Sequence, residues 1–395
     1  MKHFWITKVT VEELTKELVS FDSVSHRSNR AISERVAEIL QDMGFEVEWI
    51  EYNDVQGVGK VSLVCKRDPD PESDPEATES DKGGVAYMAH TDVVPVDDWD
   101  TGFSGPFEAV ERSNRLYGRG TCDMKGSLAS AIKAVSRIDR QEQKKPIYFV
   151  VSSDEEVGME GAKHIDKRSK YFQEMVNRGC VGIIGEPTEL QVVRAHKGTL
   201  GYIIRSKGIS AHTSTGEGTN ANYALIPILP KLLELREMTE RDSAYHNQAF
   251  DPPTLSWNMV LRNEPLAVNV TTALAEAVLF LRPMPGVNDQ PIVDAIHALC
   301  KEYQLELIEK GRNKPWEVAA QADWIQKMLQ IVGGTSAKAV CYATDGGVLQ
   351  RLEQMLVCGP GSIDQAHRKD EWVSIDQLNK AVAIYERAFR DWATV

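Results

Sequence analysis

The sequence predicts an α/β protein in which helices cover a mixed sheet, with a second, α+β domain inserted into the first. Short apolar runs alternate with helical periodicity in both terminal parts of the chain, and the middle part changes to half-buried strand patterns. The length of 395 residues exceeds what one hydrophobic core usually organises. With 42% hydrophobic and 26% charged residues, the composition is that of a globular protein.

The N-terminal part alternates helices and strands. The expected elements are helices at 10–20, 31–43 and 161–175 and strands at 47–50, 61–65, 85–89, 147–153 and 181–187. One stretch, 67–82, is rich in acidic residues, proline and serine and cannot bury much apolar surface. We expect it to be a solvated surface loop.

The middle of the chain has its own pattern. We expect strands at 199–208, 254–261 and 272–283 and helices at 221–238 and 291–303. After about residue 312 the first pattern returns, with a strand at 339–346 leading into a helical run, a strand at 355–362 and a helix from Ser374. The predicted domains are therefore 1–192 with 313–395, and an inserted 193–312.

Composition excludes several classes of function. A net charge of −13 repels polyphosphates and argues against nucleic acid or an anionic membrane as a partner. No apolar run reaches the length of a membrane span, and the N-terminus lacks the pattern of a signal peptide, so we expect a cytoplasmic protein. The six cysteines lack CxxC spacing, which indicates neither a disulfide framework nor a thiolate zinc site.

Polar side chains follow the predicted strands at the points where the strands end. His90 and Asp92 follow the strand at 85–89 and, two residues apart in extended chain, face the same way. This spacing suits a metal-binding imidazole and the carboxylate that orients it. Glu155 and Glu156 follow the next strand, where adjacent carboxylates repel each other unless a cation compensates.

Three further residues complete the pattern. Glycines bracket Asp123 on a turn before a helix expected from about Lys125. Instead of binding a metal, the Asp123 side chain could cap that helix. Glu186 ends another strand, and His367 follows a glycine-rich segment. Singly, each of these is best explained as a satisfied polar group. Together, imidazoles and carboxylates are zinc ligands, and one shared carboxylate can bridge two ions, so the set indicates a dinuclear hydrolase.

The motifs H-T-D, G-R-G-x-x-D-M-K-G, D-E-E-V-G, G-E-P-T, A-H-K-G, G-x-x-A-H and G-P-G-S-x-x-Q-A-H occur in this order over most of the chain. This set resembles the M20 metallopeptidase/deacylase family. The resemblance implies a catalytic domain like those of zinc exopeptidases and an inserted domain that serves as lid and dimerisation surface. It also implies two divalent metal ions, which would be zinc or, as a substitute, cobalt.

The resemblance assigns roles to the residues that match the motifs. Asp123 would bridge the two ions, with His90 and Glu186 on one ion and Glu156 and His367 on the other. These five residues are the expected ligands.

Two catalytic roles are implied beside the ligands. Glu155 would be the general acid/base, and Asp92 would act with it by orienting His90. The family also implies a cis peptide between Asp123 and Met124.

Residues of the inserted domain and its surroundings are implied to contact substrate. His212 would reach the active site of the other subunit and stabilise the oxyanion, which implies a homodimer through the lid domain. Arg282 would grip a substrate carboxylate, with Lys197 and Thr344 also in the substrate site.

The resemblance implies hydrolysis of the amide bond of a small N-acyl amino acid. The segments IIGEPTELQVVRAHKG and GPGSIDQAH favour N2-acetylornithine, cleaved to ornithine and acetate in arginine biosynthesis. Because ATDGG at 343–347 also resembles the T-S-D-G segment of succinyl-diaminopimelate desuccinylases, that activity stays open, as does a broad aminoacylase or dipeptidase. A non-catalytic binding protein with the same fold is the alternative from another class.

Overall fold

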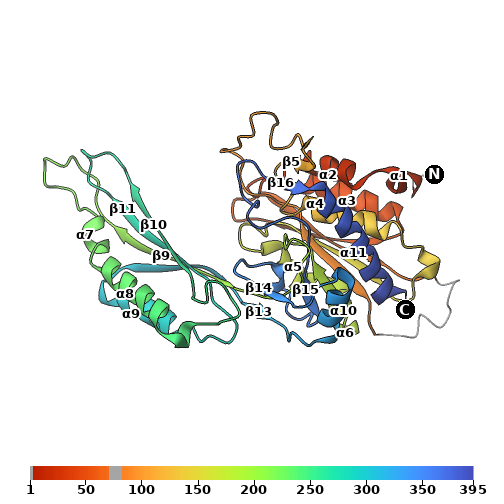
Figure 1. Cartoon of the computed structure of the whole chain (residues 1–395). Coiled ribbons are helices and arrows are strands. Elements are labelled where there is room, and N and C mark those ends of the chain that lie inside the picture. Colours follow the sequence, from red (N-terminus) through yellow and green to blue (C-terminus); the bar gives the residue numbers. More distant parts are fainter. Residues whose placement is uncertain (1–2, 71–81, 395) are drawn as a thin grey trace. The chain divides into compact units, whose positions relative to one another are not determined.

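A computed structural model describes residues 3–70 and 82–394 of the chain. Two compact units are present, drawn with their elements in Figure 1. The first comprises Met1–Arg194, Val318–Lys338 and Thr344–Val395, and the second Ala195–Glu317 and Ala339–Ala343. Among the described helices, none is both long and apolar enough to cross a bilayer.

One large sheet runs through the first unit, with strand order β1-β2-β6-β3-β7-β15-β8. Its strands are β1 (Glu46–Asn53), β2 (Gly59–Arg67), β3 (Val85–His90), β6 (Ile147–Ser152), β7 (Val181–Ile184), β8 (Val193–His196), whose last two residues belong to the second unit, and β15 (Met355–Val357). The four central strands β6, β3, β7 and β15 are parallel, whereas β1, β2 and β8 run antiparallel to their neighbours. The carboxyl ends of the four parallel strands therefore lie at one edge of the sheet.

The apolar runs form these strands because both faces of the sheet are covered. Every residue of β3 and β6 is buried, which is the pattern of parallel strands between helices. Side chains alternate between the two faces, so that Tyr87 and Phe149 enter the core shared with α4 and α11, while their neighbours point to the other face. The helices of this unit are α1 (His3–Lys8), α2 (Val11–Val19), α3 (Arg30–Asp42), α4 (Lys125–Val135), α5 (Glu160–Arg168), α6 (Lys170–Arg178), α10 (Asp323–Val332) and α11 (Ile375–Ala393).

Smaller elements complete the first unit. A three-stranded sheet has the order β16-β5-β4. Its strands are β4 (Val110–Arg112), β5 (Arg115–Tyr117) and β16 (Trp372–Ser374), and the 3₁₀ turns are Arg140–Glu142 and Asp345–Gly347.

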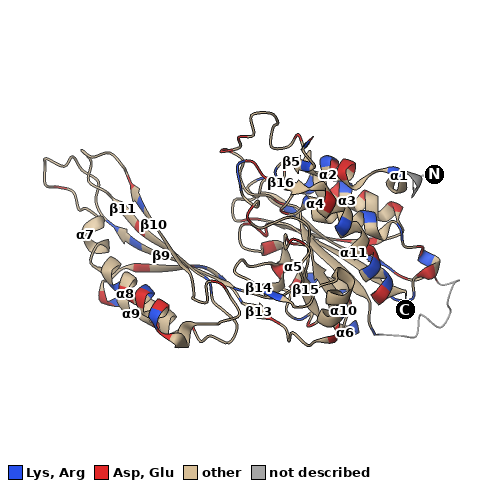
Figure 2. Cartoon of the chain, viewed as in Figure 1, with Lys and Arg blue, Asp and Glu red and all other residues tan. Residues whose placement is uncertain are grey.

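The second unit is a four-stranded antiparallel sheet, β10-β11-β9-β12, whose one face packs against helices. Its elements are β9 (Thr199–Lys207), α7 (Asn222–Leu225), α8 (Ile228–Arg241), a 3₁₀ turn at Ser243–Tyr245, β10 (Trp257–Glu264), β11 (Leu274–Leu281), α9 (Gln290–Glu302) and β12 (Glu306–Asn313). The short strands β13 (Trp316–Glu317) and β14 (Lys338–Val340) pair with β8. Figure 2 shows acidic and basic residues mixed along α8, where pairs such as Arg236 and Glu240 lie one turn apart.

Most predicted elements are confirmed, and the differences have local causes. The helical stretch at 161–175 is two helices, because Ser169 leaves the helical conformation and its Oγ accepts a hydrogen bond from the N–H of Phe172 at the start of α6. The helical run expected after residue 346 is wrong, since only the 3₁₀ turn Asp345–Gly347 forms there. The predicted acidic loop falls mostly on residues 71–81, which lie outside the described residues.

Candidate metal centre

The predicted metal ligands lie just beyond the carboxyl ends of the parallel strands. His90 is the last residue of β3, Glu156 follows β6, and Glu186 follows β7. Asp123 lies in the turn before α4, and His367 in the segment after β15. Because these strands are neighbours, their polar ends converge, and residues far apart in sequence come together.

The two carboxylate oxygens of Asp123 face two different imidazoles. Oδ1 lies 3.0 Å from Nε2 of His90, and Oδ2 lies 3.3 Å from Nε2 of His367. Two ligand atoms bound to one tetrahedral zinc ion at about 2.1 Å stand about 3.4 Å apart. The observed separations therefore suit one ion beside each oxygen, which is how a carboxylate bridges two metals.

The other predicted ligands join the two ends of this carboxylate. Glu186 Oε1 lies 3.6 Å from Nε2 of His90, and Glu156 Oε2 lies 2.9 Å from Nε2 of His367. Ligand atoms of His90, Asp123 and Glu156 all fall within 4.8 Å of one another, as do those of His90, Glu155 and Glu186. The structure thus brings all five predicted ligands and Glu155 into one cluster.

Burial and mutual repulsion make this cluster electrostatically costly. Burial, together with the charge of Asp123, raises the pKa of Glu156 to about 7, and burial raises the pKa of Glu155 and Glu186 well above the usual range. Hydrogen bonds with Asp123 and Glu156 raise the pKa of His367 to about 10. A divalent cation compensates such a group of carboxylates, so the donor set fits two metal ions.

His90 is oriented so that Nε2 faces the cluster. Its Nδ1 lies 2.9 Å from the main-chain oxygen of Asp92 and donates its hydrogen there, which leaves the Nε2 lone pair for a metal. The carboxylate that was expected to accept this hydrogen lies farther away, with Oδ1 of Asp92 at 3.6 Å from Nδ1. The orienting acceptor is therefore the backbone of Asp92.

The carboxylate of Asp92 instead holds the segment that carries the two glutamates. It accepts hydrogen bonds from the N–H groups of Glu155 at 3.1 Å and Glu156 at 3.3 Å, and from Ser25 Oγ at 2.8 Å. Asp92 thus links the end of β3 to the residues that follow β6, and it positions Glu155 and Glu156 rather than touching the candidate metal positions.

A residue that the sequence did not reveal holds the turn of Asp123. The buried carboxylate of Glu371 accepts hydrogen bonds from the backbone N–H groups of Gly120, Cys122 and Asp123 at 2.8–3.0 Å. Arg119 Nη1 lies 2.9 Å from the same carboxylate. Glycine suits the turn because Gly120 has a φ of 86°. No motif of the sequence distinguishes Glu371 from the acidic residues around it.

This turn differs from an ordinary helix cap. The N-cap of α4 is Met124, without a side-chain hydrogen bond, so the alternative role of Asp123 as a helix cap does not apply. The peptide between Asp123 and Met124 is cis, as the resemblance implied.

The remaining predicted residues are divided between the two units. His212, Arg282 and Lys197 belong to the second unit, and Thr344 to the first. His212 is exposed, with Nδ1 2.7 Å from Ser214 Oγ.

Lys197 and Thr344 are engaged within their own surroundings. Lys197 is buried and its ammonium donates to the main-chain oxygens of Pro252 and Thr254 at 2.9 and 2.6 Å. Thr344 is buried too, and its Oγ1 accepts a hydrogen bond from the N–H of Gly346 at 3.0 Å.

Comparison with known families decides the family of the chain. The model of peptidase family M20/M25/M40 matches residues 86–391. The chain belongs to this family. An acetylornithine deacetylase of Vibrio atlanticus (strain LGP32) is 30% identical over 393 residues, which cover 96% of this chain and 98% of the relative.

Solved structures of M20 proteins share the fold. The dipeptidase Dug1p of Saccharomyces cerevisiae matches with a TM-score of 0.74 at 15% identity, covering 99% of this chain and 98% of that chain. A dinuclear metal-binding M20 peptidase of Bacillus subtilis matches with a TM-score of 0.59 at 14% identity. The match covers 99% of this chain and 98% of that chain. The chain is thus an M20 amidohydrolase, and at the sheet edge it has a cluster of imidazole and carboxylate side chains whose donor atoms lie close enough together to hold a metal ion.

Proposed function

We propose that this M20 enzyme hydrolyses N2-acetylornithine to ornithine and acetate with two divalent ions, zinc in preference to cobalt. The observation that carries the metal chemistry is the position of Asp123, whose two oxygens face the imidazoles of His90 and His367. The 30% identity to acetylornithine deacetylases over nearly the whole chain supports the substrate.

The ligands would divide as the geometry suggests. His90 and Glu186 would hold one ion, Glu156 and His367 the other, and Asp123 both. When bound, the ions polarise the amide carbonyl and lower the pKa of the attacking water.

Glu155 would move the protons of the reaction. Its carboxylate lies in the same cluster as His90 and Glu186 but is left over when the ligands are assigned. It takes a proton from the attacking water and returns it to the leaving amine nitrogen. Asp92 holds Glu155 in place through the hydrogen bond from the Glu155 N–H to its carboxylate.

Residues outside the cluster would bind substrate and the oxyanion. We assign oxyanion stabilisation to His212 of a partner subunit and substrate contacts to Arg282, Lys197 and Thr344. We also propose a homodimer through the second unit.

A second candidate substrate class is a dipeptide or a succinylated diamino acid. The fold matches of a human carnosine dipeptidase and of Dug1p keep a dipeptidase open, although identities of 15% speak for the fold alone.

Initial rates separate these activities. Chelator-stripped protein is reloaded with zinc or cobalt and assayed on N2-acetylornithine, N-succinyl-diaminopimelate, a neutral N-acetyl amino acid and a dipeptide. The proposal expects metal-dependent turnover with N2-acetylornithine strongly preferred. Preference for another substrate would overturn the substrate assignment, and absence of turnover on all four would overturn the catalytic one.

A further inference from the structure

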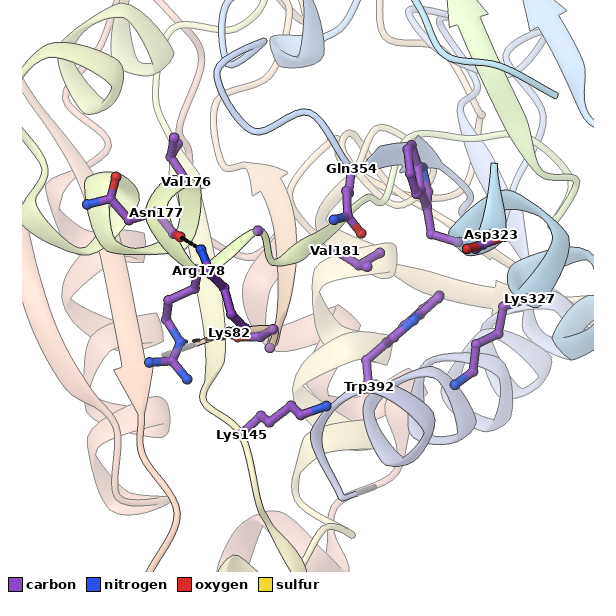
Figure 3. Close-up of a pocket in the computed structure, with 14 residues that line it drawn as sticks. Lys82, Lys145, Val176, Asn177, Arg178, Val181, Asp323, Lys327, Gln354 and Trp392 are labelled. Atoms are coloured by element: carbon purple, nitrogen blue, oxygen red, sulfur yellow. Dashed lines mark hydrogen bonds between the residues drawn. The ribbon is translucent and has the colours of Figure 1, made fainter. Parts of the chain in front are cut away.

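A buried lysine, Lys60, lies at the same edge of the large sheet as the candidate metal centre. It is the second residue of β2, and β2 runs antiparallel to β6, so the start of β2 lies beside the end of β6. There the N–H of Ser153 donates to Ser62 Oγ at 3.1 Å. Figure 3 shows a pocket at the opposite edge of the sheet, where Val181 begins β7.

The ammonium group of Lys60 has partners only a protein interior can supply. It donates to the main-chain oxygens of Ser25 and Arg27, the latter at 2.9 Å, and it lies 2.9 Å from Asp154 Oδ1. Lys60 and Asp154 are both buried. Taking a charge out of water is costly unless an opposite charge compensates it, so each member of this pair depends on the other.

Asp154 directly precedes the two glutamates of the cluster. Its φ of 55° lies in the left-handed region, which non-glycine residues adopt rarely, so contacts must hold the chain here. Its Oδ1 faces Lys60, and its Oδ2 accepts a hydrogen bond from the hydroxyl of Tyr52 at 2.8 Å. The ring of Tyr52 stacks on His164, with 4.2 Å between the ring centroids. Asp154 is therefore held from β1 and from β2.

Lys60 also supports the second anchor of the same segment. The N–H groups of both glutamates donate to the carboxylate of Asp92. Ser25 Oγ donates to this carboxylate at 2.8 Å, and the main-chain oxygen of Ser25 accepts from Lys60. One ammonium group therefore holds the segment from two sides, through Asp154 and through Ser25.

We propose that Lys60 is a positioning residue that sets the geometry of Glu155, which moves the proton, and of Glu156, a metal ligand. The inference rests on the proposed function, to which these two roles belong. Without the ammonium group, Asp154 is a buried carboxylate that lacks its counter-ion. It then leaves its place, and the two glutamates that follow it shift. A displacement of about 1 Å in a reacting group can cost about 10²-fold in rate.

The variant Lys60→Met tests the proposal in the full-length protein, because methionine fills the buried space without the charge. Competition with a chelator should show a zinc affinity at least about tenfold below that of the wild type, since a ligand loses its support. At saturating zinc, kcat on N2-acetylornithine should also fall by at least about tenfold. KM should stay near the wild-type value, because the displaced groups act on the proton and the metal.

Two lysine variants are the controls. Lys66 lies at the other end of β2 and pairs with Asp68 at 3.0 Å and Glu174 at 2.9 Å. Lys66→Met therefore removes an ion pair from the same strand. Lys145→Met changes a lysine of the pocket at the opposite edge of the sheet (Figure 3). Both variants should keep the wild-type zinc affinity and kcat.

A milder variant tests the route through Asp154. Tyr52→Phe keeps the charge pair and removes only the hydroxyl that donates to Asp154. Zinc affinity should fall by about three- to tenfold, because one hydrogen bond to a charged group is lost. Tyr171→Phe is the matched control, since its hydroxyl donates at 2.5 Å to Glu46, at the other end of β1. It should bind zinc as the wild type does.

If Lys60→Met does not fold, Lys60→Met/Asp154→Asn replaces it, because removing both charges of a buried pair costs the fold less than removing one. The same losses are expected.

Three results would overturn the inference. They are wild-type zinc affinity and kcat in the Lys60 variant that folds, equal losses in Lys66→Met, and equal zinc affinity in Tyr52→Phe and Tyr171→Phe. A wild type that binds no metal and hydrolyses none of the substrates would contradict the proposed function itself, and the inference with it.

Discussion

The carboxylate of Glu371 accepts a hydrogen bond from the backbone N–H of Asp123, at 3.0 Å and across 248 residues of sequence. Asp123 faces both imidazoles of the candidate metal centre, so its backbone must be held in register with them. The N–H groups of Gly120 and Cys122 share the same acceptor. Glu371 therefore positions Asp123, a proposed metal ligand, through the backbone of that residue.

The substitution Glu371→Gln should weaken metal binding. Oε1 of Glu371 accepts from the N–H groups of Cys122 and Asp123, and Oε2 accepts from Arg119 Nη1 and the N–H of Gly120. An amide puts an NH₂ group in the place of Oε2 and removes the charge that pairs with Arg119, so the turn of Asp123 shifts. Loss of such supporting partners typically costs about 10–100-fold in metal affinity. Competition with a chelator measures the affinity.

Glu353→Gln, an exposed change of the same type, is the control. A lower unfolding temperature with unchanged metal affinity would mean that Glu371 supports the fold alone.

Glu155→Gln should separate metal binding from turnover. The variant keeps every assigned ligand but lacks the group that moves the proton, so kcat should fall by about 10²–10⁴-fold with two ions still bound. Steady-state kinetics and metal analysis of one preparation check both. Glu160→Gln on α5 serves as control. Near-normal kcat in Glu155→Gln would assign the proton transfer to another residue.

His367→Ala should lower the metal content from two ions to one. His367 contacts Glu156 and one oxygen of Asp123, whereas His90 and Glu186 keep their own contacts at the other oxygen. Elemental analysis after dialysis counts the ions. If the variant retains two ions, the assignment of His367 as a ligand is wrong.

The stability of the second unit should fall in mild acid because of His196. Burial lowers the pKa of His196 to about 4, and its Nε2 has no hydrogen-bond partner among the described residues. The folded protein keeps this imidazole neutral below pH 6.5, while the unfolded chain takes up a proton. Stability therefore decreases as pH falls from about 6.5 to 4, by about 2 kcal/mol at pH 5.

The variant His196→Asn isolates this effect. Asparagine can replace the Nδ1 donor that faces the main-chain oxygen of Lys197 at 2.8 Å and does not titrate. Denaturant unfolding at pH 7 and pH 5 should show a smaller pH dependence than in wild type or in His246→Asn. An equal pH dependence in all three proteins would exclude His196 as its source.

The sequence predicted what depends on local pattern. His90, Glu156 and Glu186 could be placed together because buried strands end just before them and neighbouring parallel strands end at one edge. Asp123 and His367 joined the set through their glycine-rich segments and their ligand chemistry, and the order of motifs then gave each its role. The cis peptide also came from the family resemblance and is confirmed.

What the sequence did not show depends on tertiary contacts. The role of Glu371 arises from hydrogen bonds about 250 residues apart along the chain, which no periodicity encodes. The carboxylate of Asp92 accepts a hydrogen bond from the backbone N–H of Glu155 instead of orienting His90, because the segment after β6 places that N–H beside it. The dimer and the cytoplasmic location stay predictions.

A titration of metal-free protein with zinc tests whether two ions bind at Asp123 and support hydrolysis. Hydrolysis of N2-acetylornithine is measured at each step, with the bound ion counted in the same samples. Activity should rise to a plateau at two ions per chain in the wild type, whereas His367→Ala should reach a plateau at one ion with little activity. Full wild-type activity with one ion, or with none, would contradict a dinuclear centre bridged by Asp123.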